Sequence, residues 1–465
     1  MRSRTLLILS LFVAGLGAFI WLFERDLPSS DERAERAGRL VQVDGDEVVA
    51  LTVEMGSQKL RLERSASTDE DAKDGSQWRL VEPLSARADA SLADGLVRQL
   101  VELEQVRIVE DIDLASAGLV SPRAQVRMET DRGEYQLRIG NEVPASSAMM
   151  VAVGDSDTVV VVSNSVWSDL TRVPGDWRSK DVFAASAEQI QSVTFEHAGA
   201  RTVLSRRDGG FWLDVPVADR ADDDKVHALL TELAGLQVSE FVDSPGSDSE
   251  LGLTVPSAII ELDVVGTDEP LRLELGGPTS EEDTRVYARA EGQRFRLEST
   301  LDEALARSLS EWRSAQLSHL EVYQINGGVF AGTGGEVSIA RDGGDWRRGA
   351  DKIDFGPATD VLYALTGAEA SEILDRPAAS ERGLPGAEPE LSVTLTTKEG
   401  GTETINLYPG VESGVPVENA ARDVVLMLSA ETAEDILGKL ESLRLAEAQA
   451  EGEADPPTTP DSGTG

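Results

Sequence analysis

The sequence predicts an α+β protein: an N-terminal transmembrane helix followed by three tandem repeats of an antiparallel-sheet-plus-helices unit. Three observations predict this class. Tryptophan and glycine markers recur at one spacing, short alternating strands come in runs split by single helices, and an uncharged apolar stretch lies near the N-terminus. Runs of strands broken by isolated helices favour antiparallel sheets over a doubly wound parallel sheet.

The repeat is visible as a period of about 134 residues. Trp78, Trp212 and Trp346 are separated by 212 − 78 = 134 and 346 − 212 = 134 residues. The turn Arg207-Asp208-Gly209-Gly210 returns as Arg341-Asp342-Gly343-Gly344, again 134 residues later. Solenoid and propeller repeats run roughly 20–50 residues, so this period is too long for them. It is the length of a small domain.

Two further motifs repeat in the same order. Gly118-Leu119, followed by a proline, returns as Gly252-Leu253, and a degraded copy stands at Gly383-Leu384. Trp177-Arg178-Ser179 returns as Trp312-Arg313-Ser314, 135 residues later. Several markers in one order at one period indicate that a single unit was triplicated.

Composition limits the classes of partner. At roughly 150 residues per domain, 465 residues predict about three domains. The formal net charge of −41 repels nucleic acid and anionic lipid surfaces, so we expect no nucleic-acid partner. The chain has no cysteine, which excludes disulfides, thiolate metal sites and a cysteine nucleophile.

The N-terminal segment predicts a membrane anchor over residues 1–27. Leu6 to Phe23 is an uncharged run that, as a helix, spans roughly 27 Å, close to the thickness of the hydrocarbon core. Arg2 and Arg4 precede it, which places the N-terminus in the cytoplasm and the bulk of the chain outside. A cleaved signal peptide is the alternative, but bulky Phe19-Ile20-Trp21 stands where a cleavage site should lie.

The remaining chain divides by composition and repeat markers into a stalk over 28–46, three units and a tail. The units cover 47–184, 185–318 and 319–445, and the acidic, Pro-rich tail over 446–465 is predicted to be disordered. Each unit reads as a hairpin, a helix, a meander of strands and a closing helix. The predicted meander strands are 125–130, 135–139, 149–153 and 158–162; 258–264, 271–275, 285–289 and 295–297; and 391–396, 404–407, 415–417 and 424–428.

Leucine spacing predicts the helix that follows each hairpin. Asp89 opens the first, with Leu92, Leu96, Leu100 and Leu103 on one face, and Asp222 opens the second. A carboxylate at the first position accepts from free backbone N–H groups and suits the helix dipole. The closing helices are predicted at 166–171, 301–309 and 432–443.

The repeated tryptophans allow two interpretations. Trp78, Trp212 and Trp346 are predicted to be inward anchors of their hairpins, packed on the leucine face of the next helix and in similar surroundings. The alternative makes them exposed stacking platforms for sugars. Trp177-Arg178 and Trp312-Arg313 stand between units, and we expect them to set the angle there, with Arg on the indole or holding a carboxylate. The third unit ends at Leu443-Arg444-Leu445 without this motif.

No residue pattern predicts catalysis, a metal or a cofactor. Asp222-Asp223-Asp224 opens a helix, whereas calcium loops place oxygens at alternate positions with a glycine at the bend. His197, His227 and His319 are the only histidines and lack ligand spacing. Phosphate-binding, dinucleotide-binding and nucleophile-elbow motifs are missing from the sequence. We therefore expect no enzyme activity, no cofactor and no metal.

With these motifs, and with the strand ends Leu137-Arg138-Ile139-Gly140 and Leu273-Glu274-Leu275-Gly276, the chain resembles the bacterial domain of unknown function 4340 family from about Val48 to Leu443. The resemblance implies a single-span protein on the outer side of the inner membrane, associated with gliding-motility-type ABC transporters. It carries no functional residue over. Arg347-Arg348 departs from the pattern, because an apolar residue is expected after Trp346.

The expected function is a non-catalytic, membrane-anchored periplasmic accessory or scaffold of an ABC-type export or gliding-motility-like assembly, with protein partners in the membrane complex. Two alternatives stay open. A module that binds cell-envelope glycans would use the tryptophans and tyrosines, and a carboxylate-dependent hydrolase would need two acids converging in a deep cleft.

Overall fold

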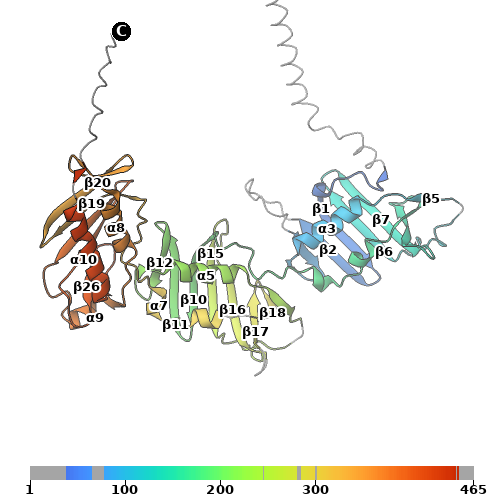
Figure 1. Cartoon of the computed structure of the whole chain (residues 1–465). Helices are drawn as coiled ribbons and strands as arrows, with labels where there is room; N and C mark the ends of the chain where they lie inside the picture. Colours follow the sequence, from blue (N-terminus) through green and yellow to red (C-terminus); the bar gives the residue numbers. More distant parts are fainter. Residues whose placement is uncertain are drawn as a thin grey trace, which may run out of the picture. The chain divides into compact units, whose positions relative to one another are not determined.

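The computed structural model describes residues 38–64, 78–110, 112–243, 246–279, 284–298, 301–446 and 448–449. The predicted membrane span Leu6–Phe23 and nearly all of the predicted tail lie outside these residues. Within the described ranges, no helix has the length and apolar character needed to cross a membrane. The chain divides into two compact units, Met1–Asp181 and Val182–Gly465, of which the first holds one repeat and the second holds two (Figure 1).

Each repeat is one antiparallel sheet. The strands of the first repeat are β1 (Val48–Met55), β2 (Gln58–Arg64), β3 (Trp78–Glu82), β4 (Ala86–Arg87), β5 (Arg107–Val109), β6 (Ala124–Thr130), β7 (Gly133–Glu142), β8 (Ala148–Val153) and β9 (Val159–Ser163). Its helices are η2 (Gly45–Glu47), α3 (Ala90–Val101), α4 (Trp167–Leu170) and η3 (Pro174–Trp177).

The second repeat has the same succession of elements. Its strands are β10 (Ile190–His197), β11 (Ala200–Arg207), β12 (Gly210–Val215), β13 (Asp219–Arg220), β14 (Val238–Phe241), β15 (Ala258–Val264), β16 (Leu271–Pro278), β17 (Arg285–Ala290) and β18 (Gln293–Glu298). Its helices are α5 (Asp223–Ala234), α6 (Leu301–Leu305) and α7 (Leu309–Trp312).

The third repeat adds one helix and one strand. Its strands are β19 (Ile325–Gly332), β20 (Gly335–Asp342), β21 (Asp345–Arg348), β22 (Asp351–Ile353), β23 (Glu372–Asp375), β24 (Leu391–Thr397), β25 (Thr402–Leu407), β26 (Val415–Asn419), β27 (Val424–Leu428) and β28 (Ala448–Gln449). Its helices are α8 (Phe355–Thr366), α9 (Arg376–Glu381) and α10 (Ala430–Leu445).

The order of the strands across the sheet is the same in all three repeats. It runs β4-β3-β2-β1-β6-β7-β8-β9-β5 in the first and β13-β12-β11-β10-β15-β16-β17-β18-β14 in the second. The third runs β23-β27-β26-β25-β24-β19-β20-β21-β22-β28, which is the same order read from the other edge with β28 added. The predicted tandem units with antiparallel sheets are therefore confirmed. Within each repeat, the hairpin strands and the meander strands belong to one sheet.

One face of each sheet packs against helices. In the first repeat α3 buries Leu96 and Leu100 against the sheet, and its first residue is preceded by Asp89, whose side chain accepts from the Leu92 N–H at 3.0 Å. Asp222 does the same for α5, accepting from Lys225 N–H at 3.1 Å. In the third repeat α8 and α10 lie side by side over the sheet (Figure 1).

The Gly-Leu motifs form loops on the other face of the sheets. Gly118, Gly252 and Gly383 have φ of +72°, +70° and +69°, a left-handed conformation that favours glycine. The leucine after each glycine donates its N–H to a carbonyl five residues earlier, and Leu119 and Leu253 are buried at 1% exposure. The degraded third motif therefore has the same backbone conformation as the first two.

The prediction of three equivalent tryptophans is wrong for Trp212. Trp78 and Trp346 are buried in their cores, but in the second repeat Phe211 takes that place and Trp212 faces the opposite side of its strand. Strand register shows the equivalence, because Trp78 pairs with Arg64, Phe211 with Arg206 and Trp346 with Arg341. These arginines lie over the rings they pair with, at 4.7, 4.5 and 4.8 Å from the ring centroids.

The reason for this difference lies in the turns. In Arg207-Asp208-Gly209-Gly210 the two corner residues are Asp208 and Gly209, since Arg207 pairs with Gly210. In the third repeat Asp342 pairs with Asp345, so the corners are Gly343 and Gly344. The two turns have the same four residues, but the corners fall one position later in the third repeat. An offset of one residue reverses which face of the sheet a strand residue occupies.

At the end of each repeat, a short segment pairs with one edge strand of that repeat's sheet. Ser179 donates its N–H to Arg87 O at 2.9 Å in the first repeat, and Ser314 donates to Arg220 O at 2.9 Å in the second. In the third repeat β28 pairs with β22, with Ala448 opposite Ile353. Ala448–Gln449, rather than Leu443-Arg444-Leu445, therefore occupies the position of the Trp-Arg-Ser motif.

Arg348 is the residue of the third repeat that departs most from the other two. It stands where the first and second repeats have buried Leu80 and Leu213. Its guanidinium donates to Arg444 O at 3.1 Å and to Ala446 O at 2.9 Å, carbonyls at the C-terminal end of α10. A cation there is favourable because the last carbonyls of a helix lack partners within the helix.

Candidate functional site: a buried ionic joint

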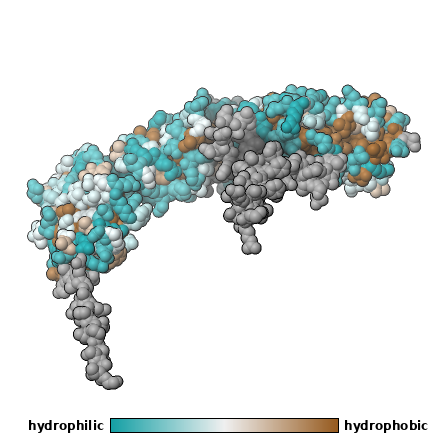
Figure 2. Space-filling view, turned by 90° about the horizontal axis from the view of Figure 1, so that it is seen from above, coloured by the Kyte–Doolittle hydropathy of each residue, from teal (hydrophilic) through white to brown (hydrophobic). Residues whose placement is uncertain are grey.

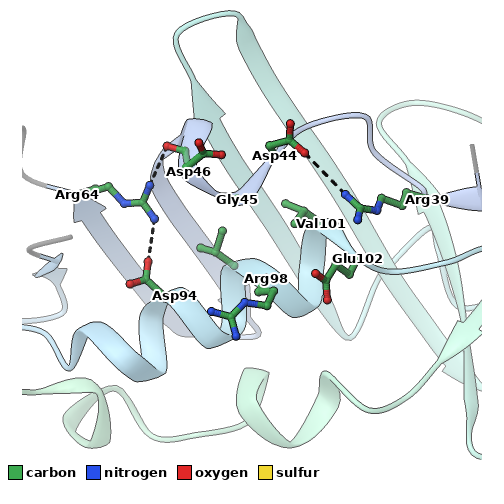
Figure 3. A pocket seen from close by; sticks show the side chains of 10 residues that line it. Arg39, Asp44, Gly45, Asp46, Arg64, Asp94, Arg98, Val101 and Glu102 are labelled. Atoms are coloured by element: carbon green, nitrogen blue, oxygen red, sulfur yellow. Dashed lines mark hydrogen bonds and ion pairs between the residues drawn. The ribbon is translucent and has the colours of Figure 1, made fainter. Parts of the chain in front are cut away.

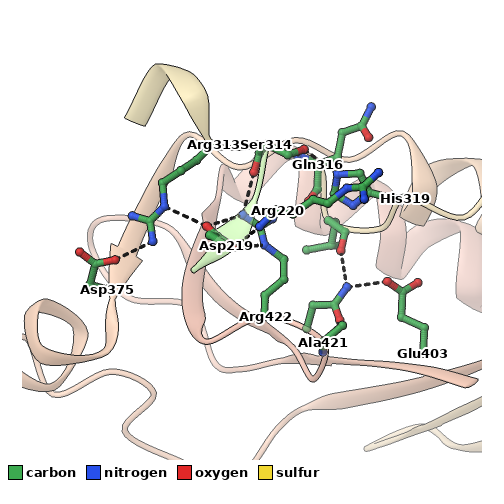
Figure 4. Close-up of polar contacts among 12 residues, drawn as sticks. Asp219, Arg220, Arg313, Ser314, Gln316, His319, Asp375, Glu403, Ala421 and Arg422 are labelled. Atoms are coloured by element: carbon green, nitrogen blue, oxygen red, sulfur yellow. Dashed lines mark hydrogen bonds and ion pairs between the residues drawn. The ribbon is translucent and has the colours of Figure 1, made fainter. Parts of the chain in front are cut away.

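The most extensively buried group of charges joins the second repeat to the third. Asp219 lies on β13, just before the helix-capping Asp222, and its side chain is fully buried. Burying an unpaired carboxylate costs on the order of several kcal/mol. The groups that pair with Asp219 therefore decide whether the fold tolerates it. Its carboxylate accepts hydrogen bonds from the Arg220 N–H at 2.8 Å and from two arginines (Figure 4).

Those two arginines come from different parts of the chain. Arg313 of the Trp-Arg-Ser motif donates Nε to Asp219 Oδ2 at 2.8 Å. Arg422, from the β26–β27 loop of the third repeat, donates Nε to Oδ1 at 2.8 Å and Nη2 to Oδ2 at 3.0 Å. Arg313 also donates Nη2 to Asp375 Oδ1 at 2.6 Å, on β23 of the third repeat. Two carboxylates and two guanidinium groups thus balance one another.

The third repeat also holds the connecting segment by its backbone. Arg422 donates to Ser314 O at 2.9 Å and to Gln316 O at 3.0 Å. Asn419 donates to Leu317 O at 2.9 Å and to Glu403 Oε1 at 2.7 Å, and Ser318 donates to the other oxygen of Glu403. The carbonyls of Ser314, Gln316 and Leu317 and the Ser318 hydroxyl of the segment therefore all have partners in the third repeat.

His319 ends this segment as a neutral side chain. Burial, together with the positive charges of Arg220 and Arg422, lowers the pKa of His319 to about 3, while Asp219 and Asp222 have a smaller raising effect. One ring nitrogen, Nε2, lies 2.8 Å from Ser314 Oγ. A histidine with such a pKa is a poor general base near neutral pH. The Ser314–His319 pair, with Ser314 buried at 4% exposure, is suited to holding the segment in place.

The tryptophan of the motif fills the core beside the joint. Trp312 is 1% exposed, and its ring lies 5.9 Å from that of Phe195 between centroids. Arg307 lies over its indole at 5.1 Å, while Arg313 binds carboxylates instead. Of the two roles predicted for the arginine of the motif, Arg313 has the carboxylate-binding one.

The first repeat has the same motif with different surroundings. Trp177 is fully buried, and Arg178, at 5% exposure, donates Nε to Gly175 O at 3.1 Å. Ala88 and Ala221 pair with Arg178 and Arg313, so Ala86 stands at the position of Asp219. The carboxylate that organises the second motif therefore has no counterpart at that position in the first repeat.

A polar pocket of about 560 Å³ lies beside α3 of the first repeat (Figure 3). Arg64 donates to Asp46 O and to Asp94 Oδ1, both at 2.8 Å, and Trp78 Nε1 also donates to Asp94 Oδ1 at 2.8 Å. Arg39 faces Asp44 at 3.9 Å. Acids and arginines alternate along its wall, so the pocket favours neither an anion nor a cation.

The aspartates at the start of α5 have structural roles. Asp222 caps α5, and Asp223 accepts from the Phe211 N–H at 2.7 Å and from Arg220 at 2.8 Å, so these carboxylates have structural partners. No cluster of three or more potential metal ligands occurs in the described ranges. Asp219, Asp375 and Arg422 were not predicted. Nothing local marks them, because the Asp219–Arg422 pair joins residues 203 positions apart.

The three sheets define the class of protein: a tandem-repeat α+β protein whose copies share one sheet topology. A family model described as domain of unknown function (DUF4340) matches residues 78–253 and again residues 212–386. Together the matches span more than half of the 465 residues. The chain belongs to the DUF4340 family.

The two family matches also reproduce the repeat. They begin at residues 78 and 212, and 212 − 78 = 134 is the period of the sequence markers. Neither the curated proteins nor the solved structures contain a match to this chain.

Proposed function

We propose that the chain is a non-catalytic scaffold: a periplasmic accessory protein of an ABC-type export or gliding-motility-like assembly, anchored in the bacterial inner membrane by residues 6–23. One observation carries the proposal. The buried, charged side chains of Asp219, Arg313 and Arg422 join the second repeat to the third. Buried charge of this kind serves geometric specificity in some proteins, which is the property a scaffold needs.

The repeats themselves support a scaffold with several contact surfaces. Three sheets of one topology present three outer faces to partners, while their cores are separate. Triplication multiplies surface without requiring any one copy to form a deep cleft. The membrane anchor and the ABC-type partner derive from the sequence and from the family resemblance.

The proposal is tested by capturing the full-length chain with its neighbours from native membranes after mild cross-linking. Recovery of an ATPase together with its permease supports the proposal. The matched control is the same chain with Leu6–Phe23 replaced by a cleavable signal peptide, which exports the repeats without an anchor. Recovery of the same partners by both forms would contradict a role that depends on anchoring.

The hydrolase alternative has less support in the structure. In the pocket beside α3, Asp94 accepts from both Arg64 and Trp78, and Asp44 is paired with Arg39. The glycan alternative through repeated tryptophans is also weakened, because Trp78 and Trp346 are 3% and 1% exposed. A different surface favours a glycan.

A further inference from the structure

The outer face of the third sheet is open over β20, β19, β24 and β25. Its central cross-strand row is Ser338, Val329, Thr394 and Thr404. Two further rows flank it on the same four strands. One is Ala340, Gly327, Thr396 and Thr402, and the other is Glu336, Ala331, Ser392 and Asn406. Apart from Gly327, every residue in the three rows is at least partly exposed. We call these twelve positions the neutral face.

The neutral face carries one charge, at Glu336. The same twelve positions of the first repeat hold eight charged residues, including Arg61 and Arg127 in the central row. The paired positions of the second repeat hold six, including the central Glu261 and Arg272. Because the three sheets have one topology, the fold does not require this loss of charge.

The charges of the other two faces are organised as ion pairs. Arg61 contacts Glu129 at 2.7 Å, and Arg272 contacts Glu261 across neighbouring strands. Cross-strand pairs of this kind stabilise a sheet surface in water. The third sheet replaces them by hydroxyl, amide and small apolar side chains. In Figure 2 the third repeat, at the left, carries much white surface of intermediate hydropathy.

The chemistry of the neutral face selects among ligands. The net charge of −41 repels anions, and the face offers no Lys or Arg to counter this. For a cationic ligand, the twelve positions offer one carboxylate, Glu336. The face measures roughly 20 Å on a side from strand and residue spacings, about half the area that one partner contributes to a standard protein interface. None of the twelve positions holds a Trp, Tyr or Arg, the anchors on which protein interfaces depend.

A neutral polyhydroxylated chain fits what remains. Ser, Thr and Asn side chains both donate and accept, as sugar hydroxyls do, and they carry no charge that must be desolvated. Tyr323, 64% exposed, stands two residues before β19, next to the end of the face where the Lys398 N–H donates to Gln324 O. Aromatic rings of this kind pack on the apolar faces of sugars. We propose that the neutral face binds an uncharged glycan.

The test uses an exchange between repeats. Thr394→Glu with Thr404→Arg places in the third repeat the pair that occupies the same positions in the second, Glu261 and Arg272, so the fold already accepts it. The control is the reverse exchange, Glu261→Thr with Arg272→Thr. The full-length chain and both variants run in detergent through native gels that contain dextran, laminarin or galactomannan, with alginate as an anionic comparison.

At least one neutral polysaccharide is expected to retard the wild-type chain, while alginate does not. The Thr394→Glu/Thr404→Arg variant should lose affinity at least about tenfold, the effect of losing two hydrogen bonds to a neutral ligand. The control variant should bind as the wild type does, and circular dichroism checks that both variants are folded. Absence of retardation by every neutral polysaccharide, equal binding by the folded exchange variant, or retardation by alginate alone would overturn the proposal.

Discussion

The first and second Trp-Arg-Ser motifs have the same three residues and different contacts. Both tryptophans are buried, and both serines donate their N–H to the preceding edge strand. Arg313, however, meets Asp219 and Asp375, whereas Arg178 donates to the carbonyl of Gly175 in its own repeat and has Ala86 at the position of Asp219. A motif therefore fixes the local backbone, while residues elsewhere decide what its charged side chain binds.

The hairpin turns teach the same lesson at the level of register. Arg207-Asp208-Gly209-Gly210 and Arg341-Asp342-Gly343-Gly344 have the same letters but different corner residues. The outcome is that Phe211 enters the core and Trp212 lies between Arg207 and Arg220, at 4.8 and 5.7 Å from their guanidinium carbons. Core volume is filled by an aromatic ring in either case.

The largest expected effect comes from breaking the buried ionic joint between the second and third repeats. Asp219→Ala leaves Arg313 and Arg422 buried without their shared carboxylate, and should lower the free energy of unfolding by about 3–5 kcal/mol. Urea denaturation of the full chain, followed by tryptophan fluorescence, measures this loss. Ser85→Ala, at an exposed position beside β4 of the first repeat, is the control and should change little. Equal stability of Asp219→Ala and wild type would show that the joint adds nothing.

The second prediction separates two adjacent aromatic residues. Phe211→Ala should cost about 3–5 kcal/mol because it opens a cavity in the core, whereas Trp212→Ala should cost about 1 kcal/mol through lost stacking on arginine. Denaturant unfolding of the two variants gives the difference directly. If Trp212→Ala were the more damaging change, the register assigned to β12 would be wrong.

The third prediction concerns pH. The pKa of His319 is about 3 in the folded chain, below the ordinary value of 6.5, so the unfolded chain takes up a proton first as pH falls. The stability from neutral His319 is present above pH 6.5 and is lost as pH decreases toward 3, by up to about 1.4 kcal/mol per pH unit. The free energy of unfolding, measured between pH 7 and 4, should fall less steeply for His319→Gln than for the wild type.

The smallest expected effect compares the Gly-Leu loops. Gly118→Ala should cost about 1 kcal/mol, because φ of +72° disfavours a side chain and the neighbouring Asn141 side chain can move. Gly252→Ala should cost more, since its Cβ would lie 2.5 Å from the backbone nitrogen of Gly277. Thermal unfolding of the two variants tests the order. A reversed order would mean that the first loop is the more tightly packed.

Much of the fold was predictable because its signals are local. Asp89 and Asp222 cap the helices they were predicted to open, and the leucines spaced along α3 and α5 face the core. The meander strands begin and end within two residues of the predicted ranges, except that β7 and β16 each run three residues further at their C-terminal ends. Alternation and capping depend on neighbours in sequence, and a single chain displays both.

The candidate site was only half predictable. Arg313 stands out by repetition, but its partners Asp219 and Asp375 belong to no repeated motif, and Arg422 lies in a loop whose counterparts in the other repeats carry no arginine. Asn419 and Glu403 show no local signal either. Contacts that join residues far apart in sequence leave no trace in spacing or composition.

By itself the sequence determined the number of repeats, their α+β content and the helix starts, because a period, a hydrophobic alternation and a capping carboxylate each act over a few residues. Only the tertiary structure decided which ring enters the second core, which carboxylate Arg313 binds and which sheet face is left without charge. Those outcomes depend on strand register and on burial, and both are set when distant segments pack together.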